Sequence, residues 1–106
     1  MKTLHLNLHK KWFDMILAGK KREEYRELTD YWKKRFSKVK EHCVDNITFS
    51  NGYSKDRRQM VVKIEYITIR TGIIEWGAEK EKVYFVVSLG NILKTVNCDI
   101  SNKKRS

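Results

Sequence analysis

The sequence contains no proline, and no apolar run approaches the length of about 18 residues that crosses a bilayer. The amino-terminal stretch also lacks an unbroken apolar segment before a small-residue cleavage site, so we expect neither a membrane span nor a signal peptide. Only two cysteines occur, Cys43 and Cys98, without C-x-x-C spacing, which argues against a structural zinc site. The pattern predicts a cytoplasmic protein whose thiols are free or form one disulfide.

Several signatures of common enzymes are missing as well. The chain has no phosphate-binding glycine loop, no G-x-S-x-G segment and no dinucleotide-binding fingerprint. This disfavours nucleoside triphosphatases, the usual serine hydrolases and nicotinamide-dependent enzymes. His5 and His9 fall on one face of a predicted strand, but His42 is far away in sequence and no third ligand is evident. We therefore expect neither a metal nor a cofactor.

What the chain does contain is enough apolar surface for one folded domain. Of its 106 residues 41% are hydrophobic and 34% are charged, with three Trp, five Tyr and four Phe. Such a composition argues against disorder. The length predicts a single domain over residues 1–100, followed by a basic tail at 101–106.

The charge is strongly positive and unevenly distributed. The formal net charge is +10, and residues 10–40 hold 11 basic and 5 acidic side chains. Further basic clusters are Lys55, Arg57 and Arg58, and then Lys103, Lys104 and Arg105. Clustered cations on a small domain favour a polyanionic partner, so we expect RNA or a nucleotide-like ligand. A solvated basic surface, or a surface that docks an acidic protein, is the alternative.

The hydrophobic pattern indicates more strands than helices. Leu4, Leu6 and Leu8 alternate along a half-buried strand over 3–9, and a helix follows that ends at Gly19. Residues 20–36 fit an amphipathic helix by spacing, yet also permit a strand over 22–27. The later predicted strands are at 44–49, 60–69 with a bulge where the apolar phase switches, 83–89 and 92–96. The residues alone thus predict an α+β, mainly β domain, a small mixed barrel with one or two helices.

Residues 19–26 read GKKREEYR and match the pattern G-x-K-x-x-E-x-R through Gly19, Lys21, Glu24 and Arg26. In this motif and in the order of the predicted elements over about residues 3–96, the chain resembles the ASCH domain family. The family is related to the PUA RNA-binding barrels. The resemblance implies a PUA-like barrel of five to six strands, a strand rather than a helix over 22–27, and a short helix over 31–36.

The same resemblance implies an RNA- or nucleotide-binding cleft at this motif. Lys21 and Arg26 would donate to phosphate or carbonyl oxygens, and Glu24 would accept from a base amino group or a water. The alternative from the residues alone is a solvated face with weak ion pairs.

A second function implied by the family is hydrolysis. One bacterial branch resembles this chain in size and hydrolyses the acetyl amide of modified cytidine nucleosides, and another is ribonuclease-like. Lys21, Glu24 and Arg26 are the candidate catalytic residues for such metal-independent chemistry. The first branch has Thr where this chain has Glu24, so a second carboxylate would come from Glu65 or Glu75.

The predicted ligand contacts outside the motif are aromatic, polar and basic residues. Trp76, in a turn between two glycines, is the main candidate for base stacking, and Tyr31 and Trp32 adjoin a basic cluster. For each aromatic, plain packing is an equal alternative. We expect Asn51 and Tyr53 to frame the cleft. The residues predicted to contact a nucleic-acid backbone are Lys33, Lys34, Arg35, Lys55, Arg57 and Arg58.

Overall fold

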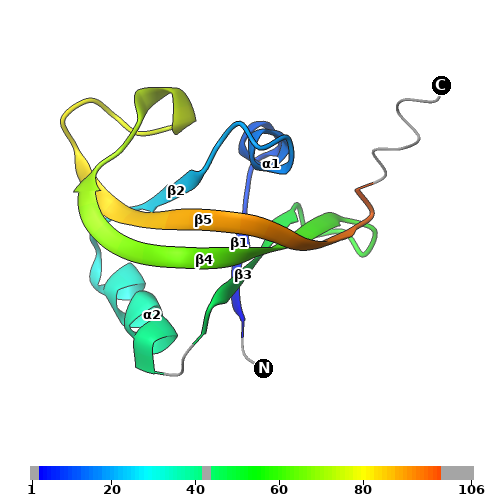
Figure 1. Ribbon diagram of the computed structural model, residues 1–106, viewed down its shortest axis with the longest axis horizontal. Helices are drawn as coiled ribbons and strands as arrows, with labels where there is room; N and C mark the ends of the chain where they lie inside the picture. Colours follow the sequence, from blue (N-terminus) through cyan, green and yellow to red (C-terminus); the bar gives the residue numbers. More distant parts are fainter. Residues whose placement is uncertain (1–2, 42–43, 99–106) are drawn as a thin grey trace.

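A computed structural model describes residues 3–41 and 44–98 of the chain, and these form five strands and two α-helices (Figure 1). The elements, in chain order, are β1 (Leu4–Asn7), α1 (Lys10–Leu17), β2 (Glu23–Arg26), α2 (Asp30–Glu41), β3 (Asn46–Asn51), β4 (Arg58–Thr71), the short 3-10 helix η1 (Ile74–Trp76) and β5 (Val83–Val96).

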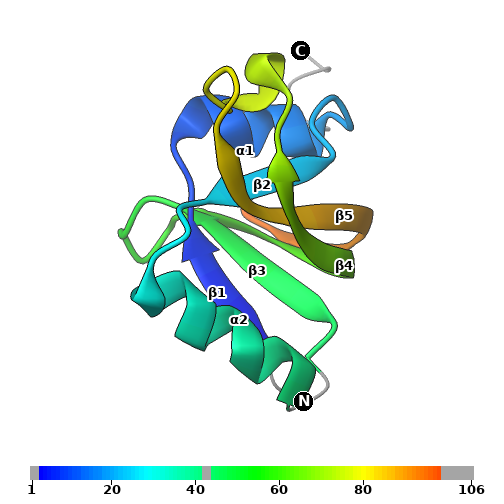
Figure 2. The same cartoon turned by 90° about the vertical axis from the view of Figure 1, so that its left-hand side faces the viewer.

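The strands form one curled sheet in the order β1-β3-β4-β5-β2. β1 pairs with β3 in parallel, and all other neighbours are antiparallel. β4 and β5 curve together across the molecule, with α1 and α2 on opposite sides of them (Figures 1 and 2). No ladder joins β1 to β2 in the described chain, so the sheet is a half-barrel with a seam between its two edge strands.

The core lies inside this curl. Phe13, Ile47, Phe49, Met60 and Val87 are completely buried there, on α1, β3, β4 and β5. β1 contributes through strict alternation, because its leucines face inward and the residues between them are exposed. Burial of this apolar surface is the main stabilising contribution to the fold.

The coarse prediction is confirmed: the domain is α+β, mainly β, and curled like a small barrel with two helices. The strand expected over 22–27 is present at Glu23–Arg26. The predicted bulge is also present, because the pairing of β4 with β5 shifts register three times between Val61 and Tyr66. These irregularities let β4 bend, and they move its apolar side chains from one face of the strand to the other.

Several boundaries differ from the prediction, among them the following three. α2 continues to Glu41 instead of ending at Phe36, because Val39 also packs on the core and extends the apolar stripe. The strand predicted over 44–49 lies at Asn46–Asn51. The two strands expected at 83–89 and 92–96 are one continuous strand, since β4 is long enough to pair with both halves.

Some predictions fall outside the described residues, among them those on His42, Cys43 and the basic tail at 101–106. Cys98 is a free thiol whose sulfur lies 3.3 Å from the Gln59 carbonyl oxygen. No helix in the described part of the chain is long and apolar enough to span a membrane.

Candidate nucleic-acid interface

The turn after α1 directs Lys21 into the protein. The helix ends at Leu17, and Gly19 adopts a left-handed conformation with φ +76° that most side chains disfavour. The backbone N–H groups of Lys20 and Lys21 then donate to the Met15 carbonyl, at 2.8 and 3.1 Å. The chain is thereby folded back, and the Lys21 ammonium lies 5.2 Å from the centre of the Trp12 ring. Gly19 therefore acts on this site through backbone geometry.

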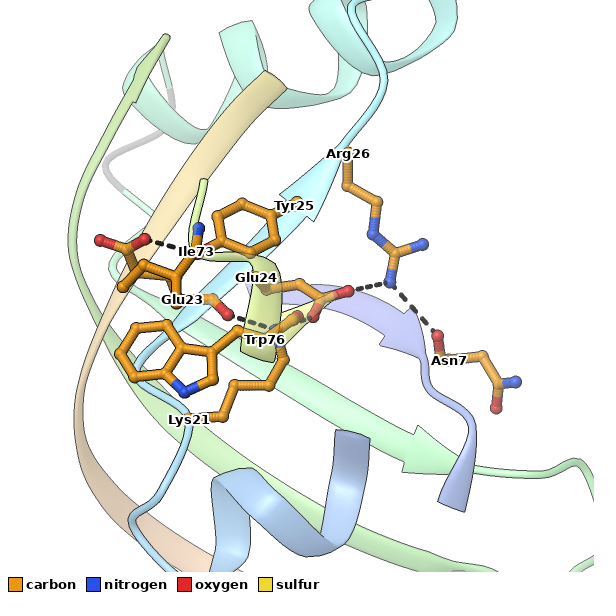
Figure 3. Close-up of polar contacts among 8 residues, drawn as sticks. All are labelled: Asn7, Lys21, Glu23, Glu24, Tyr25, Arg26, Ile73 and Trp76. Atoms are coloured by element: carbon orange, nitrogen blue, oxygen red, sulfur yellow. Dashed lines mark hydrogen bonds and ion pairs between the residues drawn. The ribbon is translucent and has the colours of Figure 1, made fainter. Parts of the chain in front are cut away.

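The Lys21 ammonium is enclosed by three oxygen acceptors. Nζ lies 2.5 Å from the Glu23 carbonyl, 2.8 Å from the Trp76 carbonyl and 3.3 Å from Glu24 Oε1 (Figure 3). Only 1% of the side chain is exposed, and this burial lowers the pKa of Lys21, although the charge of Glu24 opposes the shift. Two hydrogen bonds to carbonyl oxygens and the ion pair with Glu24 therefore hold the ammonium within the protein. Lys21 ties β2 to η1.

Glu24 connects this buried lysine to Arg26. Its Oε2 accepts a hydrogen bond from the Arg26 guanidinium at 2.9 Å, and the same NH2 group also lies 3.3 Å from the Asn7 carbonyl (Figure 3). Arg26 thus crosses the seam between β2 and β1. The exposed fraction of the side chain rises from 8% at Glu24 to 20% at Arg26. Of the three charged motif residues, Arg26 is the one that a ligand can reach.

Arg26 lies against an aromatic surface on α2. Its guanidinium carbon is 4.9 Å from the centre of the Trp32 ring, and that of Arg35 is 5.2 Å from the same ring. Arg35 also donates to the exposed Tyr31 hydroxyl at 3.1 Å and to the His5 carbonyl of β1 at 3.1 Å. We call Arg26, Tyr31, Trp32 and Arg35 the arginine–aromatic cluster.

One donor in this cluster has no partner. Arg26 Nε is buried and makes no hydrogen bond to any described residue. A buried donor without an acceptor is costly, commonly about 1–3 kcal/mol, and such groups are rare in native proteins. An anionic or carbonyl oxygen brought against this guanidinium would relieve that cost after a small movement of the side chain.

The opposite face of β2 carries a network that the sequence did not indicate. Glu23 forms an ion pair with Arg70 and accepts a hydrogen bond from the Tyr25 hydroxyl at 2.7 Å. Burial raises the pKa of Glu23, but the hydrogen bonds from Arg70 and Tyr25 outweigh it and the net shift is downward. The Tyr25 oxygen also accepts from the Ile73 N–H at 2.9 Å, and burial raises the pKa of Tyr25 far above its usual value. This network fixes the segment before η1.

Asn51 and Arg58 are used for internal bracing. The Asn51 amide donates to the Leu8 carbonyl at 3.1 Å and accepts from Arg58 at 3.0 Å. Arg58 also forms an ion pair with Asp14 at 2.7 Å and lies over the Phe13 ring. These contacts hold α1 against the ends of β3 and β4. The structure thus gives Asn51 and Arg58 an architectural role, which charge and turn signals alone do not distinguish from ligand binding.

Tyr53 and Arg57 border a separate cleft of about 450 Å³, most of whose lining residues have polar side chains. We call it the turn cleft, because the β3–β4 turn forms one wall; its lining residues include His5, Asn7, Ser50, Tyr53, Arg57 and Gln59. Asn7 joins it to the motif, since its carbonyl accepts from Arg26 and its side-chain oxygen accepts from the Gly52 N–H at 3.0 Å. Figure 1 shows the turn and α2 on opposite sides of β1.

The other predicted residues lie around these two regions. Lys34 and Lys55 are exposed, and Lys33 lines a larger cleft of about 1030 Å³ between α2 and β4. Trp76 contributes its carbonyl to the Lys21 site. Glu65 and Glu75 are both exposed, and the structure shows no contact of either with the charged motif residues.

No group of three or more metal-ligating side chains occurs among residues 3–41 and 44–98. Compared with models of known families, with curated proteins and with solved structures, the chain gives no match. Any function proposed for this chain therefore has to be argued from the geometry of the site.

Proposed function

We propose that this chain is an ASCH-type domain that binds RNA or a nucleotide, with Arg26 as the residue of the motif that contacts the ligand. The observation that carries the proposal is that the Arg26 guanidinium is held in place by protein contacts while one of its N–H donors has no acceptor among the described residues. Glu24 and Asn7 fix its NH2 group at 2.9 and 3.3 Å, the Trp32 ring centre lies 4.9 Å from its central carbon, and Nε has no partner in the described structure. A planar cation held in this way suits phosphate and carbonyl oxygens.

Charge around Arg26 supports the same conclusion. Arg35 shares the Trp32 ring with it, and the exposed Lys33 and Lys34 follow on α2. Aromatic rings interleaved with cations allow a base to stack while its phosphates are neutralised. A partner that needed only net positive charge would require no such fixed guanidinium.

Hydrolysis is less well supported by the geometry. Catalysis by Lys21 would need its ammonium to face a substrate, but only 1% of the side chain is exposed and the ammonium contacts three protein oxygens. Neither Glu65 nor Glu75 contributes a second carboxylate near Glu24. Binding is therefore the function that the arrangement favours.

The test is binding of labelled single-stranded RNA and of free nucleotides across a salt series. A charged hydrogen bond contributes about 1.5–3 kcal/mol, so we expect Arg26→Ala to weaken binding by on the order of 10- to 100-fold. Arg26→Lys retains the charge but loses the planar guanidinium that lies near the Trp32 ring, and we expect intermediate binding. Each RNA mixture is also analysed for cleaved product, and a mixture with an acetylated cytidine nucleoside is analysed for deacetylated product; either product would indicate an enzyme.

Lys38→Ala is the matched control, since it removes one exposed positive charge from α2 outside the cluster. Unfolding curves of each variant exclude loss of the fold. Equal weakening by Arg26→Ala and Lys38→Ala, together with a uniform decline in salt, would mean that net charge alone accounts for binding and would contradict the proposal.

A further inference from the structure

The turn cleft contains a row of amides and hydroxyls on the outer face of the half-barrel. Asn7 of β1 is paired with Ser50 of β3, which is paired with Gln59 of β4, so the three side chains follow one another across three strands. All three line the cleft. This row is polar, in contrast to the α2–β4 cleft, whose lining is largely apolar.

The row retains hydrogen-bonding capacity for a ligand. The Gln59 amide donates to the Ser50 hydroxyl oxygen at 3.0 Å, and the Asn7 side-chain oxygen accepts from the turn. The Asn7 amide nitrogen, the Gln59 amide oxygen and the Ser50 hydroxyl proton have no partner within the described residues. Both donors and acceptors are thus present, as recognition of an unpaired base edge requires.

Tyr53 and Arg57 give this cleft the other features of a nucleotide site. Tyr53 is 86% exposed, so its ring is open to solvent instead of packed in the core. Arg57 and His5 supply cationic or donor groups, and none of the described residues that line the cleft is acidic. A volume of about 450 Å³ accommodates a ligand of nucleotide size.

We infer that the chain binds single-stranded RNA along β1, with one unpaired nucleotide in the turn cleft and a neighbouring part of the strand on the arginine–aromatic cluster. The inference rests on the proposed function and specifies its ligand as single-stranded RNA. The link is Asn7, whose backbone carbonyl contacts Arg26 while its side chain lines the turn cleft. A free nucleotide fills one of the two regions, and a duplex keeps its base edges paired, so only an unpaired strand uses both.

The experiment measures the affinity of the intact chain for a labelled RNA of about eight nucleotides, within the length that small single-strand-binding folds cover. A duplex of the same sequence and a free nucleoside monophosphate serve as comparisons. Base stacking on an aromatic ring contributes about 1–3 kcal/mol, so Tyr53→Ala should weaken single-strand binding by on the order of 5- to 100-fold. Tyr53→Phe, which keeps the ring, should bind nearly as the wild type does.

Arg57→Ala and Lys55→Ala form a matched pair, because each removes one positive charge from the same turn and only Arg57 lines the cleft. We expect Arg57→Ala to weaken binding more than Lys55→Ala at every salt concentration. Equal effects of Tyr53→Ala, Arg57→Ala and Lys55→Ala, with binding still lost in Arg26→Ala, would overturn this inference and leave the proposed function standing. Preference for the duplex would also overturn it. No binding of any RNA or nucleotide by the wild type would overturn both.

Discussion

Glu24 orients Arg26: its Oε2 lies 2.9 Å from the guanidinium of the residue two positions along the same strand. Alternate residues of a strand share a face, so the spacing E-x-R makes this contact possible. Because the guanidinium is held before a ligand arrives, less side-chain entropy is lost on binding. The other Glu24 oxygen faces the buried Lys21, which gives the carboxylate a structural role as well.

The Lys21–Glu24 pair should behave as one unit in stability measurements. We expect Glu24→Gln to lower the free energy of unfolding by about 3–5 kcal/mol, because it leaves the buried Lys21 ammonium without its carboxylate. Lys21→Met should lower it by less, because Glu24 keeps its ion pair with Arg26. The double variant should lose less than the sum of the two, since neither charge then remains unpaired. Urea unfolding of all four proteins measures the coupling.

Lys10→Ala is the control for this cycle. Lys10 pairs with Asp14 at 2.8 Å, but 78% of its side chain is exposed, so the change should cost less than about 1 kcal/mol. Strict additivity of Lys21→Met and Glu24→Gln would contradict the picture of a coupled buried pair.

The sequence predicted this grouping only through the motif. Spacing placed Glu24 and Arg26 on one face of a strand, but it could not show that Lys21 turns inward beneath Trp12, because that depends on the turn at Gly19 and on the Trp76 carbonyl, which is 55 positions away. The contact of Arg26 with Trp32 joins β2 to α2. It depends on how α2 is placed against the sheet, and neither local periodicity nor composition predicts that placement. Clustered charge likewise cannot distinguish the bracing Arg58 from the cleft-lining Arg57.

Tyr25→Phe should destabilise the protein by about 1–3 kcal/mol. The lost hydroxyl both donates to Glu23 at 2.7 Å and accepts from the Ile73 N–H at 2.9 Å, and removal leaves those two groups without this partner. Tyr31→Phe is the matched control, because the Tyr31 side chain is exposed and water can replace its hydroxyl. Thermal or urea unfolding provides the comparison, and equal stabilities of the two variants would contradict the proposed role of the network.

Acid should weaken the fold partly through Glu23. Its pKa is lower in the folded protein than the usual value of 4.5, so the charged form contributes stability above that pH and the contribution is lost as the pH falls through the folded pKa. The free energy of unfolding, measured at about pH 7 and at about pH 3, should therefore decline less in Glu23→Gln than in the wild type. Arg70→Gln should also reduce the decline, because Arg70 lowers that pKa. If the free energy of unfolding of Glu23→Gln declines as much as that of the wild type, other carboxyl groups cause the acid sensitivity.

Two glycines, Gly72 beside the network and Gly90 on β5 beside Glu65, should respond differently to alanine. At Gly72 an added Cβ would lie 2.6 Å from the Tyr25 ring and 2.8 Å from the Cβ of the buried Ala78, and neither neighbour is free to move. We expect Gly72→Ala to lower the free energy of unfolding by about 1–3 kcal/mol through overpacking.

At Gly90 the added Cβ would instead meet the carboxylate of Glu65, which is the end of an exposed, flexible side chain. Rotation of Glu65 relieves that contact, and alanine restricts the unfolded chain, so Gly90→Ala should leave stability unchanged or raise it by up to about 1 kcal/mol. Urea unfolding of both variants gives the test. A larger loss in Gly90→Ala than in Gly72→Ala would show that Glu65 is held in place, and would disprove the expected packing of Tyr25 against the segment that leads to η1.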